Sequence, residues 1–295
     1  MNEIEAMDVD NEKIVVYDGE KFKSDTFLRW TGSKKWLLKR IDDFLPKTFN
    51  NYHEPFLGGG SVFFYIKKLK ASSRKYFLSD INEDLINSYE QIQNNIDQLI
   101  LKLKTFKNTS DYYYKIRSQK PRNQINRAAK FIYLNRTSFN GIYRVNSKGE
   151  YNVPFGKRPN VDIVTRELFM KVNQHLENTV LECISFTHIL KNIEENDFVF
   201  LDPPYTVSHE NNGFIEYNQK LFSWDDQILL RDLVKTLIDK KVNFLLTNAS
   251  HESIKELYKD LPQITIETIS RHCKVGGRTH TRKTYNELLI FNRGY

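Results

Sequence analysis

Runs of apolar residues along the chain predict buried β-strands. Phe198-Val199-Phe200-Leu201 is continuously apolar, which is typical of a strand covered on both faces of a parallel sheet. Further strands are expected at 76–80, 180–183, 243–247, 264–266 and 287–291. The last two predict an antiparallel pair that closes the sheet.

Helical spacing of apolar side chains predicts helices between these strands. The first starts near Ser33 and ends before Pro46, which cannot continue a helix. Others are expected at 62–69, 85–103, 166–175 and 224–239. The core face of the last helix is expected to comprise Ile228, Leu229, Leu233, Leu237 and Ile238. Helices alternating with strands indicate an α/β protein.

Size and composition favour a soluble intracellular protein. The chain has 295 residues, of which 40% are hydrophobic, enough for a large core. Its apolar runs are far shorter than the roughly 20 residues of a membrane span, and its N-terminus has no apolar signal core. Cys183 and Cys273 fit neither a disulfide framework nor a zinc site, so we expect reduced thiols and no metal.

Charge is unevenly distributed. Residues 1–20 hold seven acidic residues and one lysine, a local charge of −6. Because the whole chain has a net charge of +7, the remaining residues carry +13. The acidic stretch predicts a poorly ordered tail. Nine cations and no acid stand between Tyr112 and Gly149, which favours contact with nucleic acid, because solvated helix faces usually mix charges. The loop 271–283 is a second basic candidate.

Asp202-Pro203-Pro204-Tyr205 follows the central strand directly, at the edge where α/β sheets bind their ligands. Each proline fixes its own φ and lacks an N–H, so the loop is expected to be stiff. Asp202 and the Pro203 carbonyl offer two acceptors, and Tyr205 offers a flat aromatic face. This combination suits an amino group on a planar ring. The polar stretch 206–223 predicts a mobile flap over the site.

A glycine-rich turn, Gly58-Gly59-Gly60, lies between a predicted strand and a predicted helix. Backbone amides can approach a ligand closely in such a turn. About twenty residues later, Asp80 ends another predicted strand, where it could accept hydrogen bonds from both hydroxyls of a ribose. This layout predicts a cofactor that contains a nucleoside. Packing alone also explains glycine clusters, so the turn by itself decides little.

Residues 135–152 predict a projecting β-hairpin. Asn140-Gly141 is a tight-turn signal, and Lys148-Gly149 is a second. Phe139, Ile142 and Arg144 are expected near the tip, where they could enter a DNA groove.

Six motifs occur here in one order: Arg29 to Lys34, Glu54 to Gly60, Asp80 to Asn82, Phe139 to Asn146, Pro154 to Gly156, and Asp202 to Tyr205. Together they resemble the Dam-type, α-class (D12 class) DNA adenine-N6 methyltransferases. The resemblance implies a Rossmann-like S-adenosylmethionine-dependent methyltransferase sheet with an inserted, mostly helical target-recognition domain carrying a β-hairpin. The implied domains are a tail at 1–23, a catalytic domain at 24–83 and 164–295, and a recognition domain at 84–163.

The resemblance also implies roles for individual residues. The implied catalytic residues are Asp202, Pro203 and Tyr205. The implied contacts to S-adenosylmethionine, which leaves as S-adenosylhomocysteine, are Trp30, Lys34, Glu54, Phe56, Gly58, Gly60, Asp80, Ile81 and Asp202. The implied DNA contacts are Arg29, Arg136, Phe139, Asn140, Gly141, Ile142, Arg144, Asn146 and Lys157. Relatives often have an acid where Ser185 stands, which puts one cofactor contact in doubt.

The implied reaction is methyl transfer to N6 of an adenine flipped out of duplex DNA, and likeness of the hairpin to relatives that read GATC suggests that target. A DNA-binding homologue without catalysis, and an enzyme acting on RNA adenine or cytosine N4, remain alternatives. Asp202 favours adenine, because cytosine-N4 methylases more often have serine before Pro-Pro-Tyr. A monomer or weak dimer is expected, intracellular and, if the source is bacterial, in the cytoplasm or nucleoid, and a partner restriction endonuclease remains open.

Overall fold

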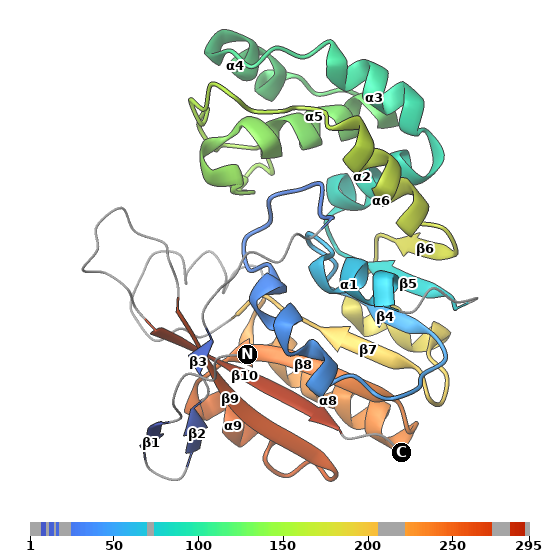
Figure 1. Ribbon diagram of the computed structural model, residues 1–295, viewed down its shortest axis with the longest axis vertical. Helices are drawn as coiled ribbons and strands as arrows, with labels where there is room; N and C mark the ends of the chain where they lie inside the picture. The colour runs from blue at the N-terminus through green and yellow to red at the C-terminus, as the bar shows by residue number, and fades with distance from the viewer. Residues whose placement is uncertain are drawn as a thin grey trace. The chain divides into compact units, whose positions relative to one another are not determined.

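The computed structural model describes residues 7–9, 12–14, 16–17, 25–69, 74–205, 222–272 and 284–292. The chain forms two compact units (Figure 1). Unit 1 comprises Met1–Phe22, Trp36–Phe56 and Phe186–Tyr295, and unit 2 comprises Lys23–Lys35 and Leu57–Ser185.

Unit 1 is built on a mixed β-sheet. Its strands are β3 (Val16–Tyr17), β4 (Tyr52–Glu54), β7 (Phe198–Leu201), β8 (Asn243–Ala249), β9 (Ile264–His272) and β10 (Thr284–Asn292). Within this unit their order is β3-β9-β10-β8-β7-β4 (Figure 1). β4, β7 and β8 are parallel, whereas β10 is antiparallel to both β8 and β9. Every residue of β7 and β8 is buried, as their apolar sequences predict.

The helices of unit 1 are η1 (Lys34–Lys39), which begins in unit 2, η2 (Ile41–Asp43), η4 (Phe186–Asn192), α8 (Trp224–Asp239) and α9 (Glu252–Tyr258). The predicted α-helix at 33–46 is therefore two short 3-10 helices. The bounds predicted for α8 are confirmed, and a capping box of Ser223 and Asp226 fixes its start.

The core face predicted for α8 is partly wrong, because Ile228 and Leu229 are exposed. The buried apolar residues at helical spacing are Leu230, Leu233, Val234, Leu237 and Ile238, and the polar Gln227 is buried on the same face. At about 100° per residue, the face that contains Leu233 and Leu237 extends back to Leu230, not to the two preceding residues.

Unit 2 joins two parallel strands to a cluster of helices. The strands are β5 (Tyr76–Ser79) and β6 (Thr179–Glu182). The helices are α1 (Ser61–Leu69), α2 (Glu83–Asn94), α3 (Ile96–Lys104), α4 (Ser110–Ser118), α5 (Gln124–Thr137), η3 (Phe139–Gly141) and α6 (Arg166–His175). α5 packs against α2, α3 and α4 (Figure 1). Residues on all sides of its second half are buried, so α5 forms the centre of this helical cluster.

Two predictions about unit 2 can be compared with these elements. α6 has the predicted bounds, whereas the predicted helix 85–103 breaks at Asn95, whose φ of −138° is not helical. The predicted domain boundaries at 83/84 and 163/164 both fall inside unit 2. The predicted division into catalytic and recognition domains stays a prediction.

Short strands lie within the acidic stretch that we expected to be poorly ordered. β1 (Met7–Val9) and β2 (Glu12–Ile14) form an antiparallel pair, and β3 pairs in parallel with β9. These residues have regular backbone structure because their polar backbone groups pair with one another and with the sheet edge. None of the described helices has the length and apolar character that crossing a membrane requires.

Candidate active site

The loop after β7 carries the predicted catalytic residues, all in unit 1. Pro203 is buried, and Asp202 and Tyr205 are half-buried. Thr247 Oγ1 of β8 donates a hydrogen bond of 2.6 Å to Asp202 Oδ1. The parallel register of β7 and β8, which pairs Leu201 with Leu246, puts Thr247 beside this aspartate. The Asp202 carboxylate is thus fixed by the neighbouring strand.

Tyr205 is fixed by a second strand. Its hydroxyl donates a hydrogen bond of 2.6 Å to Glu287 Oε2 of β10. Burial and the nearby carboxylates of Glu287 and Asp202 raise the pKa of Tyr205 well above its usual value. The phenol therefore stays protonated at neutral pH and presents an uncharged aromatic face.

Thr247 and Glu287 were not among the predicted site residues. Both lie in strands that read as apolar core segments, and Glu287 is 82 residues from its partner Tyr205. The acid within the apolar run 287–291 was the one available signal.

Two predicted cofactor residues, Glu54 and Phe56, also lie in unit 1. Glu54, the last residue of β4, is buried and accepts a hydrogen bond of 2.6 Å from the Tyr52 hydroxyl. The Phe56 ring packs against Phe186 and Phe222, with ring centroids 5.3 and 5.8 Å away. Local packing therefore orients both side chains.

The predicted glycine turn forms in unit 2 and is anchored by Asp80. Gly58 and Gly60 have positive φ values of 46° and 64°, which glycine adopts without strain. Asp80 accepts hydrogen bonds from the backbone N–H groups of Gly58 and Asn82, both at 3.0 Å. Burial raises the pKa of Asp80, and these hydrogen bonds oppose that rise. The adjacent Ile81 is 65% exposed, so an anchored carboxylate stands beside an apolar surface.

Trp30 packs against the glycine turn. A Cβ added to Gly58 would lie 2.6 Å from Trp30 Nε1, so this position has no room for a larger side chain. The Tyr143 ring is stacked on Trp30 at a centroid distance of 5.5 Å, and the Phe131 ring lies 6.3 Å from it. Lys34 is buried, and its Nζ donates to the Gly32 carbonyl.

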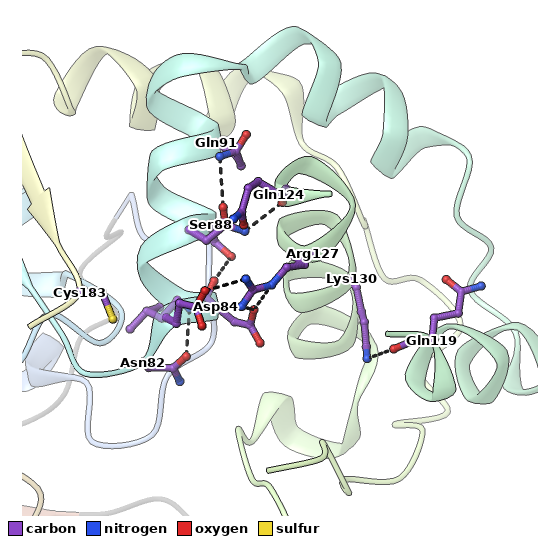
Figure 2. A network of polar contacts seen from close by, with 12 residues as sticks. Asn82, Asp84, Ser88, Gln91, Gln119, Gln124, Arg127, Lys130 and Cys183 are labelled. Carbon is purple, nitrogen blue, oxygen red and sulfur yellow. Dashed lines mark hydrogen bonds and ion pairs between the residues drawn. The ribbon is translucent and has the colours of Figure 1, made fainter. Parts of the chain in front are cut away.

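A polar network holds the start of α2, just after Asp80 and Ile81 (Figure 2). Asn82 caps the helix by accepting a hydrogen bond from Leu85 N. The Arg127 guanidinium of α5 donates to Asp84 Oδ1 at 2.7 Å and to Glu83 Oε1 at 2.7 Å (Figure 2). The nucleoside-binding candidates are thereby tied to the central helix of unit 2.

The predicted hairpin is partly wrong. Asn140 and Gly141, with φ of 55° and 66°, lie in η3 instead of in a turn between two strands. Phe139 N donates to the Pro154 carbonyl, so the returning chain already pairs at this point. An isolated bridge joins Val145 to Tyr151, and the chain reverses at 146–150 between them. The second predicted turn signal, at Lys148-Gly149, is the one used.

Several predicted DNA contacts have structural partners. The Asn146 side chain accepts hydrogen bonds from Lys148 N and Glu150 N and so shapes the turn. Arg144 is exposed, with Nε donating to Asn152 Oδ1. Tyr151 donates to the Ile142 carbonyl, whereas Lys157 is exposed and Phe139 is 52% exposed.

The cation-rich window also contains internal contacts. Arg127 pairs with Glu83 and Asp84, Lys120 pairs with Glu150, and Arg117 donates to the Val153 carbonyl. These cations are partly explained by the fold of unit 2.

Asn135 joins Arg29 to η3. Its Oδ1 accepts from Arg29 N at 2.8 Å, and its Nδ2 donates to the Arg29 and Gly141 carbonyls at 2.7 and 3.2 Å. A Cβ on Gly141 would lie 2.5 Å from Arg29 Cβ, which explains the glycine. Asn135 begins the segment predicted as a hairpin, but nothing in the sequence indicated that it links Arg29 to η3.

A cavity of about 510 Å³ in unit 2 brings cations together. Arg29, Lys35, Arg136 and Arg158 line it, with Asp162 as its carboxylate. Burial lowers the pKa of Arg136, and the charges of Arg29 and Arg158 lower it further against the opposing effect of Asp162. Within the described part of the chain, Arg158 Nε has no hydrogen-bond partner. Arg158 and Lys35 were missed as site candidates.

Two predicted features fall outside the described residues: most of the flap 206–223 and the basic loop 273–283. Among the described residues, no group of histidine, cysteine, aspartate or glutamate side chains could hold a metal ion. Cys183 is a free, exposed thiol.

A family model described as D12 class N6 adenine-specific DNA methyltransferase matches residues 30–272. The chain belongs to this family. As a D12 class methyltransferase it is an enzyme of adenine-specific DNA methylation, and the family resemblance drawn from the six motifs is confirmed.

Relatives of this D12 class enzyme cover most of its length. It is 36% identical over 278 residues to the type II methyltransferase M1.LlaDCHI of Lactococcus lactis subsp. cremoris, covering 91% of this chain and 95% of that protein. It is 35% identical over 242 residues to the type II methyltransferase M.MjaIII of Methanocaldococcus jannaschii, covering 76% and 83%. It is 29% identical over 273 residues to the DNA adenine methylase of Escherichia coli (strain K12), covering 90% and 95%.

A solved methyltransferase homologue from Pyrococcus horikoshii is similar with a TM-score of 0.39 and 11% identity, covering 86% of this chain and 65% of that chain. That likeness is too distant to assign a role to any residue.

Proposed function

We propose that this D12 class methyltransferase methylates N6 of an adenine extruded from duplex DNA, with Asp202, Pro203 and Tyr205 as its catalytic residues. The observation that carries this proposal is the fixed loop after β7. Thr247 holds Asp202 and Glu287 holds Tyr205, each through a hydrogen bond of 2.6 Å. A loop held in this way presents its acceptors and its aromatic face in one orientation.

The chemistry follows from what these groups accept. The adenine amino group is planar, and its nitrogen lone pair is delocalised into the ring. The Asp202 carboxylate and the Pro203 carbonyl accept hydrogen bonds from its two N–H groups and draw N6 towards tetrahedral geometry. The lone pair then becomes available for bond formation. Alignment and charge placement, more than a strong base, account for the rate.

Base extrusion is part of the proposal, because N6 is not accessible to these groups within a stacked duplex. Unstacking costs a few kcal/mol. The Tyr205 ring offsets part of this cost by stacking on the extruded base. Its raised pKa keeps it neutral, so no negative charge faces the base.

The residues of unit 2 fit a nucleoside-containing cofactor. Asp80 is held by two backbone N–H groups, and a carboxylate has acceptor sites left for the hydroxyls of a ribose. The exposed Ile81 side chain offers an apolar surface for an adenine ring. We assign Trp30, Lys34, Gly58 and Gly60 to the same cofactor, and Glu54 and Phe56 to its amino-acid part. When bound, S-adenosylmethionine supplies the methyl group on a positively charged sulfur.

DNA contacts are assigned to the segment from η3 to Lys157 and to Arg29 and Arg136. Phe139 is the exposed aromatic residue available as a wedge, and Arg144 can donate two hydrogen bonds to a guanine edge. We propose GATC as the target, because the segment from Phe139 to Asn146 resembles that of relatives that read GATC.

The alternatives make different predictions about activity. A DNA-binding homologue without catalysis would bind cofactor weakly, and an enzyme for RNA adenine or cytosine N4 would prefer those substrates. Methyl transfer from radiolabelled cofactor to duplex DNA containing GATC, to the same duplex with adenine replaced, and to RNA separates them. We expect incorporation into the GATC duplex alone. Incorporation into RNA, or equal incorporation after the adenine is replaced, would contradict the assignment.

A further inference from the structure

Glu287 is a buried acid in an apolar strand. It is 3% exposed and is followed in β10 by Leu288, Leu289, Ile290 and Phe291, all buried. β10 is paired on both sides, with Glu287 opposite Ala249 of β8 and Ile269 of β9. Burying a carboxylate costs free energy that an apolar residue at the same position would avoid. Sheet stability alone therefore does not explain this acid.

The Glu287 carboxylate is paired with the Tyr205 hydroxyl. The hydroxyl donates to Glu287 Oε2 at 2.6 Å, a distance typical of a charge-assisted O–H···O bond. Tyr205 lies at the end of the described loop, three residues after Asp202. The hydrogen bond therefore ties the far end of the aromatic side chain to the sheet.

We propose that Glu287 is a positioning residue that holds the Tyr205 ring in the plane in which it stacks on the extruded adenine. This inference rests on the proposed function of Tyr205. Pro203 and Pro204 restrict the backbone before the ring, and Glu287 restricts the ring at its hydroxyl. With both ends fixed, little rotational freedom is lost when the base arrives, so more of the stacking energy is available for extrusion.

The same contact has a chemical consequence. A phenol that donates to a carboxylate remains neutral, and the charge of Glu287 stays with the hydroxyl instead of facing the base. Glu287 thus acts through Tyr205 and touches neither the base nor the cofactor. Its loss should change kcat and the stacking of the extruded base, and should leave cofactor affinity unchanged.

The test uses the full chain with the substitutions Glu287→Leu, Glu287→Gln, Tyr205→Phe and the double variant Tyr205→Phe/Glu287→Leu. Single-turnover methylation gives the rate, and 2-aminopurine at the target position reports base stacking by its fluorescence. Asp197→Asn is the matched control, because Asp197 is a fully buried carboxylate just before β7 that accepts from His53, Asn51 and Glu194. Calorimetric titration with S-adenosylhomocysteine checks that each variant is folded.

We expect Glu287→Leu to lose roughly tenfold or more in rate, because a hydrogen bond to a charged group is removed. Glu287→Gln keeps an acceptor and should lose less. The double variant should be no slower than the slower single variant, since both remove the same contact. The 2-aminopurine signal should change in Glu287→Leu and not in Asp197→Asn.

Wild-type rates in both Glu287 variants, or losses that multiply in the double variant, would overturn the inference. If Glu287→Leu does not fold, Glu287→Gln and Tyr205→Phe decide the matter by the same two measurements. An inactive wild-type enzyme would contradict the proposed function instead, so the two failures are distinguishable.

Discussion

Two aspartates at the ends of β7 illustrate how residues of one kind differ in role. Asp197 precedes the strand, is fully buried, and accepts hydrogen bonds from His53 Nε2, Asn51 N and Glu194 N. Asp202 follows the strand, is half-buried, and accepts from Thr247. Because groups of the protein itself donate to both oxygens of Asp197, its role is structural, whereas Asp202 lies at the carboxyl end of β7, where we propose that the target base binds.

Asp197 makes folding depend on pH. Burial raises its pKa, but the hydrogen bonds from His53 and from two backbone N–H groups outweigh that effect and lower it. A lowered folded-state pKa gives stability that is present above the unfolded pKa of about 4 and is lost as the pH falls through the folded value. We expect Asp197→Asn to lower the free energy of unfolding at pH 7 by about 1–3 kcal/mol.

Denaturant unfolding of both proteins from pH 7 to pH 3 checks this prediction. The difference between them should shrink as the pH falls below about 4. A difference that stays constant over this range would show that the carboxylate charge is not what stabilises the fold.

Gly58→Ala tests whether the proposed cofactor-binding turn needs the space beside Trp30 to stay empty. The added methyl group would lie 2.6 Å from Trp30 Nε1, and φ at this position is +46°. We expect at least about tenfold weaker binding of S-adenosylhomocysteine, since a displaced turn or indole costs more than 1.4 kcal/mol. Calorimetry measures the affinity. Gly149→Ala is the control, because φ there is +74° but nothing lies within 4 Å. Equal losses in both would contradict a role for the contact with Trp30.

At the scale of elements, local patterns predicted what local interactions decide. The bounds of α6 and α8 follow from apolar spacing, with a capping box at the start of α8, and the antiparallel pair at the end of the chain follows from alternation. The hairpin turn predicted at Asn140-Gly141 was wrong, because the left-handed φ values that these residues adopt also occur in a 3-10 helix such as the one that follows α5. The roles of Glu287 and Thr247 could not be assigned from sequence. Glu287 lies 82 residues from Tyr205 and Thr247 lies 45 residues from Asp202, and the pairing of the strands brings them together.

Asn135 links α5 to two other segments of unit 2. It satisfies both backbone groups of Arg29 and also donates to Gly141. We expect Asn135→Ala to destabilise the protein by about 1–3 kcal/mol, because buried backbone groups lose their partners. Thermal unfolding measures this loss. Lys120→Ala is the control, since the exposed Lys120–Glu150 pair should contribute less than about 1 kcal/mol. A smaller effect for Asn135→Ala than for this control would contradict the proposed link.

At the scale of the whole molecule, charge favours binding to a polyanion. The chain carries +7, and residues beyond the acidic N-terminal stretch carry +13. A cavity in unit 2 brings Arg29, Arg136 and Arg158 together. Burial is the main cause of the lowered pKa of Arg136, and the charges of Arg29 and Arg158 lower it further, so an anion in the cavity would stabilise the charged guanidinium.

Arg136→Ala should therefore weaken binding to duplex DNA of any sequence. We expect the slope of log affinity against log salt concentration to become shallower by about one, the effect of one lost phosphate contact. Fluorescence anisotropy over a range of salt concentrations measures the slope. Lys120→Ala, which removes an exposed cation outside the cavity, serves as control. An unchanged slope for Arg136→Ala would show that this guanidinium does not meet phosphate.

We propose that Asp202, held by Thr247, activates the amino group of adenine. The most direct measurement is single-turnover transfer of radiolabelled methyl to a GATC duplex by the wild type and by Asp202→Ala, with binding of the duplex and of cofactor measured in parallel. We predict that the variant loses at least about 100-fold in rate, because it lacks a preorganised acceptor in the transition state, while its duplex affinity stays within a few-fold. Methyl incorporation at the wild-type rate by Asp202→Ala would contradict the account.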